Sequence, residues 1–309
     1  MPSILNKTKR NSRPPAAVEF SPEGILAAAL VSARARRGPA IGRGSVYAFA
    51  PLAEDALVPS IEAPNFRAPE AVAAALRTAL DALSLRKRAL TLILPDPLVR
   101  VFVLDFDAFP AKPAEAVAVA RFRLRKMVSF DVEQAGVSCQ LLAQNGAEYK
   151  VLAAIVPGPI LAEYESAVRA AGYEPGAVLS SSLAALEATD STEGILAASL
   201  AAHSITTAVA LGDELLLYRT LDLPPEPWSR AAEIARAVAV AAAYFEDKLG
   251  APPRALHYAG ILSPAEFTES IANPALQAIE WTTRPEEGAL SALPQISYAS
   301  VQGALAGAS

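Results

Sequence analysis

The stretch Glu70–Pro95, EAVAAALRTALDALSLRKRALTLILP, decides the fold class of this chain. Apolar residues recur at helical spacing in its first part, at Val72, Leu76, Leu80 and Leu83. This spacing predicts a helix over Glu70–Leu85. The apolar run Ala89–Leu94 then ends at a proline and is typical of a strand buried on both faces. A short strand-like segment, Ser45–Ala50, precedes the helix, so the order of strand, helix and buried strand favours an α/β layer over a helical bundle.

The two halves of the chain repeat this pattern. Adjacent strands open the first half over Ala17–Val31, and strands over Ile195–Ala201 and Thr206–Leu211 open the second. The longest predicted helix follows, from about Arg230 to Leu249, with Ser229 as its N-cap and Gly250 as its stop. We therefore expect an internally duplicated fold with a first domain at 16–190 and a second at 191–295. A helix within 296–309 is expected to return to the first domain.

A small subdomain interrupts the first half at about 98–176. Its predicted elements are a strand over Leu98–Phe106, a helix over Ala114–Met127, a hairpin whose turn is Asn145-Gly146, and a helix over Pro159–Ala171. Asparagine followed by glycine is a strong hairpin signal, because both residues tolerate positive φ. We expect this part to be an inserted α+β unit.

Composition excludes several classes of function. The chain has 309 residues, a net charge of -5 and 52% hydrophobic residues, many of them alanine. The acidic balance argues against a general nucleic-acid binder. The single cysteine, Cys139, excludes an intramolecular disulfide and a multi-cysteine metal site, and the presence of only two histidines, His203 and His257, argues against a multi-histidine zinc site. This cysteine usage suggests a cytosolic protein, and the apolar runs are far shorter than the roughly 20 residues that cross a bilayer.

The N-terminus is expected to be a disordered basic arm over residues 1–15. It carries four cationic residues, Lys7, Lys9, Arg10 and Arg13. A weak, salt-sensitive contact with an anionic membrane surface is the alternative interpretation. Common catalytic motifs are absent from the sequence: there is no P-loop, no dinucleotide-binding glycine fingerprint and no Gly-x-Ser-x-Gly elbow. We predict no catalytic residues, and Ser180–Ser182 are assigned to a helix N-cap and a loop.

Several short segments, in order, resemble the type IV pilus assembly protein PilM, a family of the actin-like ATPase superfamily. They are Leu92-Ile93-Leu94-Pro95, Phe109-Pro110, the segment Ser129–Glu133 after the helix, the strand Tyr149–Val156, the turn Ala170–Pro175 and the closing stretch Tyr298–Ala306. The resemblance implies an α/β, actin-like (ribonuclease H-like) duplicated fold with a small inserted α+β subdomain. It also implies that this chain is a divergent member, because its nucleotide motifs are degenerate.

Actin-like ATPases hold phosphates with two hairpin turns that each typically carry Asp-x-Gly. In this chain Glu19 stands at the first Asp position and Ser21 at the glycine, while Pro22 removes an N–H group and Glu23 would repel a phosphate. In the second turn Ser199 replaces the Asp. The vestigial positions are Glu19, Ser21, Gly24, Ser199, Thr206 and Gly260. We therefore expect a pseudo-ATPase with no cofactor and no metal; binding of ATP with Mg²⁺ is the alternative.

The function that the resemblance implies is that of a non-enzymatic adaptor on the inner-membrane platform of a type IV pilus or a related secretion machine. Such a protein is cytoplasmic, peripheral at the inner membrane, and grips the N-terminal peptide of a PilN-like membrane partner beside other platform or motor proteins. The implied groove lies near Leu98–Phe106 and the following helix. Its candidate anchors are Arg121, Phe122, Arg123 and Arg125, for which a solvated helix face is the alternative. The alternative functions are an actin-like ATPase with an unorthodox site, a type II secretion platform component and a sugar-kinase-like enzyme.

Overall fold

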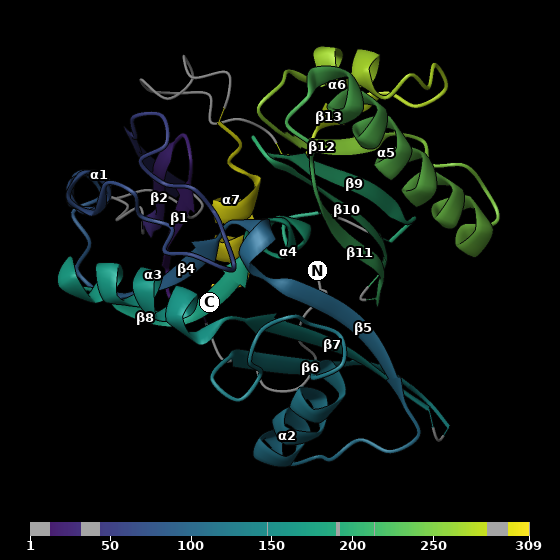
Figure 1. The fold of residues 1–309 in the computed structure, drawn as a ribbon, viewed down its shortest axis with the longest axis horizontal. Helices are drawn as coiled ribbons and strands as arrows, with labels where there is room; N and C mark the ends of the chain where they lie inside the picture. Colours follow the sequence, from purple (N-terminus) through teal and green to yellow (C-terminus); the bar gives the residue numbers. More distant parts are fainter. Residues whose placement is uncertain are drawn as a thin grey trace, which may run out of the picture.

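Two five-stranded sheets with the same strand order form the framework of the molecule (Figure 1). A computed structural model describes residues 13–31, 44–146, 148–189, 192–212, 214–282 and 296–308. The first sheet has the order β3-β2-β1-β4-β8 and the second β11-β10-β9-β12-β13. In both sheets three antiparallel strands come first, and two parallel strands join the edge of the first of them. This identity of topology is the duplication that the sequence predicts.

The strands of the first sheet are β1 (Ala16–Ser21), β2 (Gly24–Val31), β3 (Gly44–Pro51), β4 (Ala89–Leu94) and β8 (Glu174–Ser180). Those of the second are β9 (Ile195–Leu200), β10 (Ser204–Leu211), β11 (Glu214–Asp222), β12 (Leu256–Gly260) and β13 (Ala278–Glu280). Strand β4 is buried along its length after Ala89, because it lies between β1 and β8 with helices on both faces. This explains the unbroken apolar run that decides the fold class.

Helices cover both sheets. Helices α1 (Pro69–Ala82) and α3 (Gly158–Ala170) pack on one face of the first sheet, where Tyr164 meets the ring of Phe20 edge-on at 5.1 Å. The other face carries α4 (Ser181–Leu186) and α7 (Ala299–Ala306), which pack against each other. Helices α5 (Pro227–Leu249) and α6 (Pro264–Ser270) cover the outer face of the second sheet (Figure 1).

The inserted layer is a three-stranded sheet with one helix. Its strand order is β5 (Arg100–Phe106), β7 (Glu148–Val156), β6 (Gly136–Asn145), all antiparallel. Helix α2 (Pro113–Leu124) covers one face of this sheet, and the opposite face turns toward the first domain. A turn of 3₁₀ helix, η1 (Asp96–Leu98), leads into it from β4. The predicted hairpin turn is confirmed, since Gly146 lies between β6 and β7 with φ of 61°.

The structure differs from the sequence predictions at several places. The predicted insertion, about 98–176, includes α3, yet α3 packs on the first sheet, where Tyr164 donates a hydrogen bond to Asn65 at 2.8 Å. The predicted N-cap Ser229 is wrong: α5 begins at Pro227, and Glu226 precedes it as the cap. Proline suits the first helical position because its missing N–H is not needed there. The predicted stop is confirmed, with Gly250 left-handed at φ of 73°.

The N-terminal arm is described only from Arg13 onward, and the predicted basic residues Lys7, Lys9 and Arg10 lie outside the described residues. Arg13 forms an ion pair with Glu187 at 2.8 Å and a β-bridge with Ala308. This residue is therefore fixed against the end of the chain. None of the helices in the described part of the chain is long and apolar enough to span a membrane.

Candidate functional site

The two duplicated hairpin turns face each other across a cleft between the sheets. The β1–β2 turn contributes Glu19 and Ser21, the β9–β10 turn contributes Ser199, and Gly260 ends β12. These four predicted positions line one cavity of about 150 Å³.

The other two predicted positions do not line this cavity. Gly24 closes the first turn, where Ser21 Oγ accepts a hydrogen bond from its N–H at 3.3 Å. Thr206 lies buried on β10 and pairs with the Thr220 hydroxyl at 3.0 Å. The backbone is crowded at Gly24 and Gly260. A Cβ at Gly24 would lie 2.4 Å from the Phe49 ring, and one at Gly260 would lie 2.4 Å from the Leu200 carbonyl oxygen.

Glu19 is held by the C-terminal helix. The Ser300 hydroxyl on α7 donates a hydrogen bond to its carboxylate, and Ser181, whose hydroxyl donates to the Leu94 carbonyl oxygen at 3.1 Å, is a second polar group beside it. Burial raises the pKa of Glu19 from 4.5 to about 7, against the opposing effect of the two serines. The nearby Asp96 carboxylate raises this pKa further. The residue at the first Asp position therefore joins α7 to the first sheet and is half protonated near neutral pH.

A second buried carboxylate, Asp96, lies where β4 ends. It accepts hydrogen bonds from the backbone N–H of Ser182 at 2.9 Å and from the Ser182 hydroxyl. The Tyr218 hydroxyl on β11 donates a third at 2.9 Å and lies 3.1 Å from Ser180 Oγ. Burial raises the pKa of Asp96 and that of Tyr218. Since Asp96 belongs to the first domain and Tyr218 to the second, this network links the two domains at the base of the cleft.

Sequence reasoning missed both Asp96 and Tyr218. The sequence does contain a signal for Asp96, because this residue follows Pro95 at the carboxyl end of a buried strand. Ligand-binding sites of α/β sheets lie at the carboxyl ends of their strands. Tyr218 carries no such signal, because only the duplicated topology brings β11 against η1. The acidic residues Asp105 and Asp107 lie exposed at the far end of β5. No group of three His, Cys, Asp or Glu residues in the described ranges could hold a metal.

A separate groove runs between the first domain and the inserted sheet. Its apolar walls come from β7, α3, β8 and α4, with Leu152, Ala154, Val156, Leu161, Val178, Leu179 and Leu183. Ser138 and Gln140 on β6, Ser180 and Arg13 supply its polar groups. The groove has a volume of about 260 Å³. It lies on the face of the inserted sheet opposite to α2.

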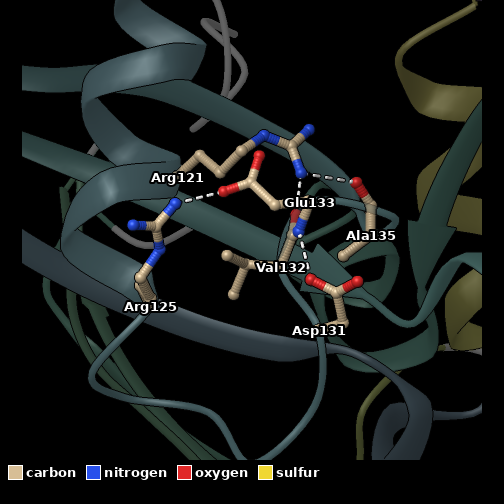
Figure 2. A network of polar contacts seen from close by, with 6 residues as sticks. All are labelled: Arg121, Arg125, Asp131, Val132, Glu133 and Ala135. Carbon is tan, nitrogen blue, oxygen red and sulfur yellow. Dashed lines mark hydrogen bonds and ion pairs between the residues drawn. The ribbon is translucent and has the colours of Figure 1, made fainter.

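Three of the four predicted anchor residues lie on α2 and the fourth, Arg125, is the residue that caps its end; all are away from this groove. Arg121, Phe122 and Arg125 line an outward hollow of about 410 Å³, and Phe122 is 71% exposed. The Arg121 guanidinium donates to the carbonyl oxygens of Val132 and Ala135, the latter at 3.0 Å (Figure 2). This arginine therefore holds the segment between α2 and β6.

Arg125 is also engaged within the subdomain. It pairs with Glu133, whose backbone N–H donates to the Asp131 carboxylate at 2.9 Å (Figure 2). Arg123 is exposed and makes no ion pair within the described part of the chain. The role of these arginines as peptide anchors stays a prediction. Arg121 and Arg125 already bind other groups of the inserted subdomain.

Comparison with known proteins agrees with this architecture. A chain from the structure of a PilM–PilN type IV pilus biogenesis complex superposes with a TM-score of 0.69 and 17% identity, over 97% of this chain and 100% of that one. A protein of unknown function from Bacteroides thetaiotaomicron with the actin-like ATPase fold gives a TM-score of 0.53 and 13% identity, over 94% of each chain. This chain has the actin-like fold. The predicted α/β fold and the predicted resemblance to PilM in fold are confirmed.

Weaker likeness extends to a secretion protein. The cytoplasmic domain of EpsL, an inner-membrane component of the type II secretion system of Vibrio cholerae, gives a TM-score of 0.49 and 14% identity, over 94% of this chain and 92% of that one. No protein-family model and no curated protein matches the sequence. The comparison of structures therefore identifies the fold, whereas the comparison of sequences does not.

Proposed function

We propose that this chain is a non-enzymatic adaptor of a type IV pilus or related secretion platform, and that it binds the cytoplasmic N-terminal peptide of a PilN-like membrane partner. The groove between the first domain and the inserted sheet is the observation that carries the proposal. The nearly complete superposition on a chain from a PilM–PilN complex supports it. In this proposal the protein works in the cytoplasm at the inner membrane.

The chemistry of the groove suits a short apolar peptide. Its long walls are aliphatic, and it carries a few hydroxyl and amide groups that can orient a peptide backbone. Recognition of this kind needs an apolar slot with a few polar anchors and no catalytic group. The half-exposed β6 residue Gln140 and the exposed Ser138 place these anchors on one wall.

The proposal includes the absence of ATP turnover. Phosphoryl transfer needs a carboxylate that directs Mg²⁺ and backbone N–H groups that cradle phosphate. Here the carboxylate of Glu19 is bound to Ser300, and Pro22 and Glu23 occupy the first turn. In the second turn the Arg230 guanidinium binds the carbonyl oxygen of Ala202, so this cation is engaged with the protein backbone.

Fluorescence anisotropy with a synthetic peptide tests the proposal. The peptide is taken from the cytoplasmic N-terminus of a PilN-like single-span membrane protein. Ser138→Trp fills the groove from β6 and should weaken binding at least tenfold. The matched control is Leu141→Trp on the same strand, since Leu141 is 45% exposed and does not line the groove. Absence of binding by the wild type at high micromolar peptide, or equal loss in both variants, would overturn the proposal.

A further inference from the structure

The mouth of the interdomain cleft holds a second, larger hollow of about 680 Å³. The loop after β3 forms one wall, and the start of α5 forms the other. Apolar side chains make up most of its floor, among them Leu52, Val58, Leu200, Ile261 and Leu262. The volume lies within the range of ligand pockets. The hollow adjoins the small cavity that Glu19 lines, and the two share lining residues, among them Glu23, Leu200 and Ile261.

Three carboxylates stand on the first-domain wall of this hollow. They are Glu23 in the β1–β2 turn and Glu54 and Asp55 after β3. None of them forms an ion pair within the described ranges, and Glu54 and Asp55 are exposed. On the facing wall the guanidinium of Arg230 is directed to the backbone carbonyl oxygens of Ala201 and Ala202. These carbonyl oxygens are neutral, so Arg230 keeps its positive charge, and the three carboxylates still give the hollow a net negative charge.

The apolar floor and the carboxylates on the wall together favour a positively charged occupant. Three carboxylates around an apolar floor repel the phosphates of a nucleotide and attract cations by Coulomb interaction. An apolar floor of this size also requires an occupant with aliphatic or aromatic groups, since a bare polyamine would leave it unfilled. Both requirements are met by a peptide in which basic residues flank apolar ones.

We propose that this hollow, the acidic slot, binds a segment of a partner protein in which lysine or arginine residues flank leucine-like residues. The slot is independent of the groove at β6, so the proposal does not rest on the adaptor function. The apolar residues of the segment pack on Leu52, Ile261 and Leu262, and its cations face Glu54 and Asp55.

An exposed tryptophan is next in sequence to a residue that lines the acidic slot. Trp228 is 78% exposed and directly follows Pro227, which lines the slot. Tryptophan is enriched at protein interfaces, and an exposed one beside an apolar hollow favours use as a contact. The other tryptophan, Trp281, is buried, with its ring N–H donating to Thr189 at 2.8 Å. We therefore expect the fluorescence of Trp228 to respond when the slot is occupied.

Titration with three labelled heptapeptides tests the proposal: KLLKLLK, its acidic counterpart ELLELLE and its apolar-free counterpart KGGKGGK. The first should bind, and the other two should bind at least tenfold more weakly. Its binding should shift Trp228 emission to shorter wavelength. Neutralising the wall with Glu23→Gln, Glu54→Gln and Asp55→Asn should weaken binding about tenfold, as three exposed charge pairs allow. Asparagine at 55 tolerates the left-handed φ of 61° found there.

Matched controls separate the slot from general attraction to an acidic protein. Glu246→Gln with Asp247→Asn, at the far end of α5, removes charge elsewhere and should leave binding unchanged. Ala231→Trp plugs the slot from an exposed helix position and should abolish binding, whereas Ala239→Trp on the same helix should not. Equal binding of KLLKLLK and KGGKGGK, or equal effects of both charge-neutralised variants, would overturn the proposal. Tighter binding of a peptide of residues 1–12 than of KLLKLLK would also overturn it, because the occupant would then be the chain's own arm.

Discussion

Replacing Glu19 by glutamine should change how stability depends on pH. Burial raises the pKa of Glu19 to about 7 in the folded protein, whereas the same group has a value of 4.5 when freely solvated. Between these values the folded state binds more protons than the unfolded state. The free energy of unfolding therefore falls as the pH rises through this interval. The stability that protonated Glu19 provides is complete below pH 4.5 and is lost above about pH 7.

The size of the effect follows from the interval. From 4.5 to about 7, at about 1.4 kcal/mol per pH unit, the wild type should lose about 3 kcal/mol relative to a variant that does not titrate. Glu19→Gln is such a variant, and its side-chain amide oxygen can still accept the hydrogen bond from Ser300. The difference in free energy of unfolding between Glu19→Gln and the wild type should therefore be more favourable to the variant at pH 8 than at pH 5.

Urea unfolding followed by circular dichroism measures this difference. Wild type and Glu19→Gln are unfolded at pH 5, 6, 7 and 8, and the difference in free energy of unfolding is plotted against pH. We expect a change of about 2.5 kcal/mol in favour of the variant across the series, since part of the titration lies below pH 5. A constant difference at all four values would refute the reasoning, since it would mean that Glu19 titrates at its ordinary pKa in the folded protein.

Three further outcomes can be checked directly. Tyr218→Phe removes one of three hydrogen bonds to buried Asp96 and should lower the free energy of unfolding by about 1–3 kcal/mol, measured in urea; no change would contradict the interdomain link. Gly303→Ala should destabilise by about 1–3 kcal/mol despite alanine's higher helix propensity, because its Cβ would lie 1.7 Å from the Ala184 carbonyl oxygen; a rise in Tm would show that α4 and α7 separate easily. Millimolar Mg-ATP should leave Tm unchanged within about 1 °C, and a rise of several degrees would contradict the pseudo-ATPase proposal.

The sequence predicts the framework well because its strongest signals are local. The apolar run before Pro95, the Asn145-Gly146 turn and the helix stop at Gly250 each act within a few residues, and the structure contains all three features. Strand β8 gives no such signal, because Glu174–Ser180 includes proline and glycine, which weaken strand propensity. As an edge strand it tolerates the proline. The six-residue helix α4 is too short to show a period.

The candidate site was harder to predict, because its contacts join distant parts of the chain. Ser300 reaches Glu19 across 281 positions, and Tyr218 reaches Asp96 across 122. No spacing rule relates such pairs. The family resemblance located the turns but could not show that their polar groups contact other parts of this protein. The groove residues could not be predicted for the same reason. The arginines near α2 stand out in the sequence, but the groove is lined by residues of β6, β7 and β8.

The polar groups at the cleft favour a fixed arrangement of the two domains. An ATPase of this fold needs its carboxylates free to direct metal and water. In this chain Asp96 receives hydrogen bonds from both domains, and Glu19 receives one from the helix that ends the chain. Opening the cleft would leave a buried carboxylate with fewer partners, at a cost of about 1–3 kcal/mol for each lost bond. Such a molecule is suited to presenting constant surfaces, so its binding sites should be sought in grooves that exist without nucleotide, such as the β6 groove and the acidic slot.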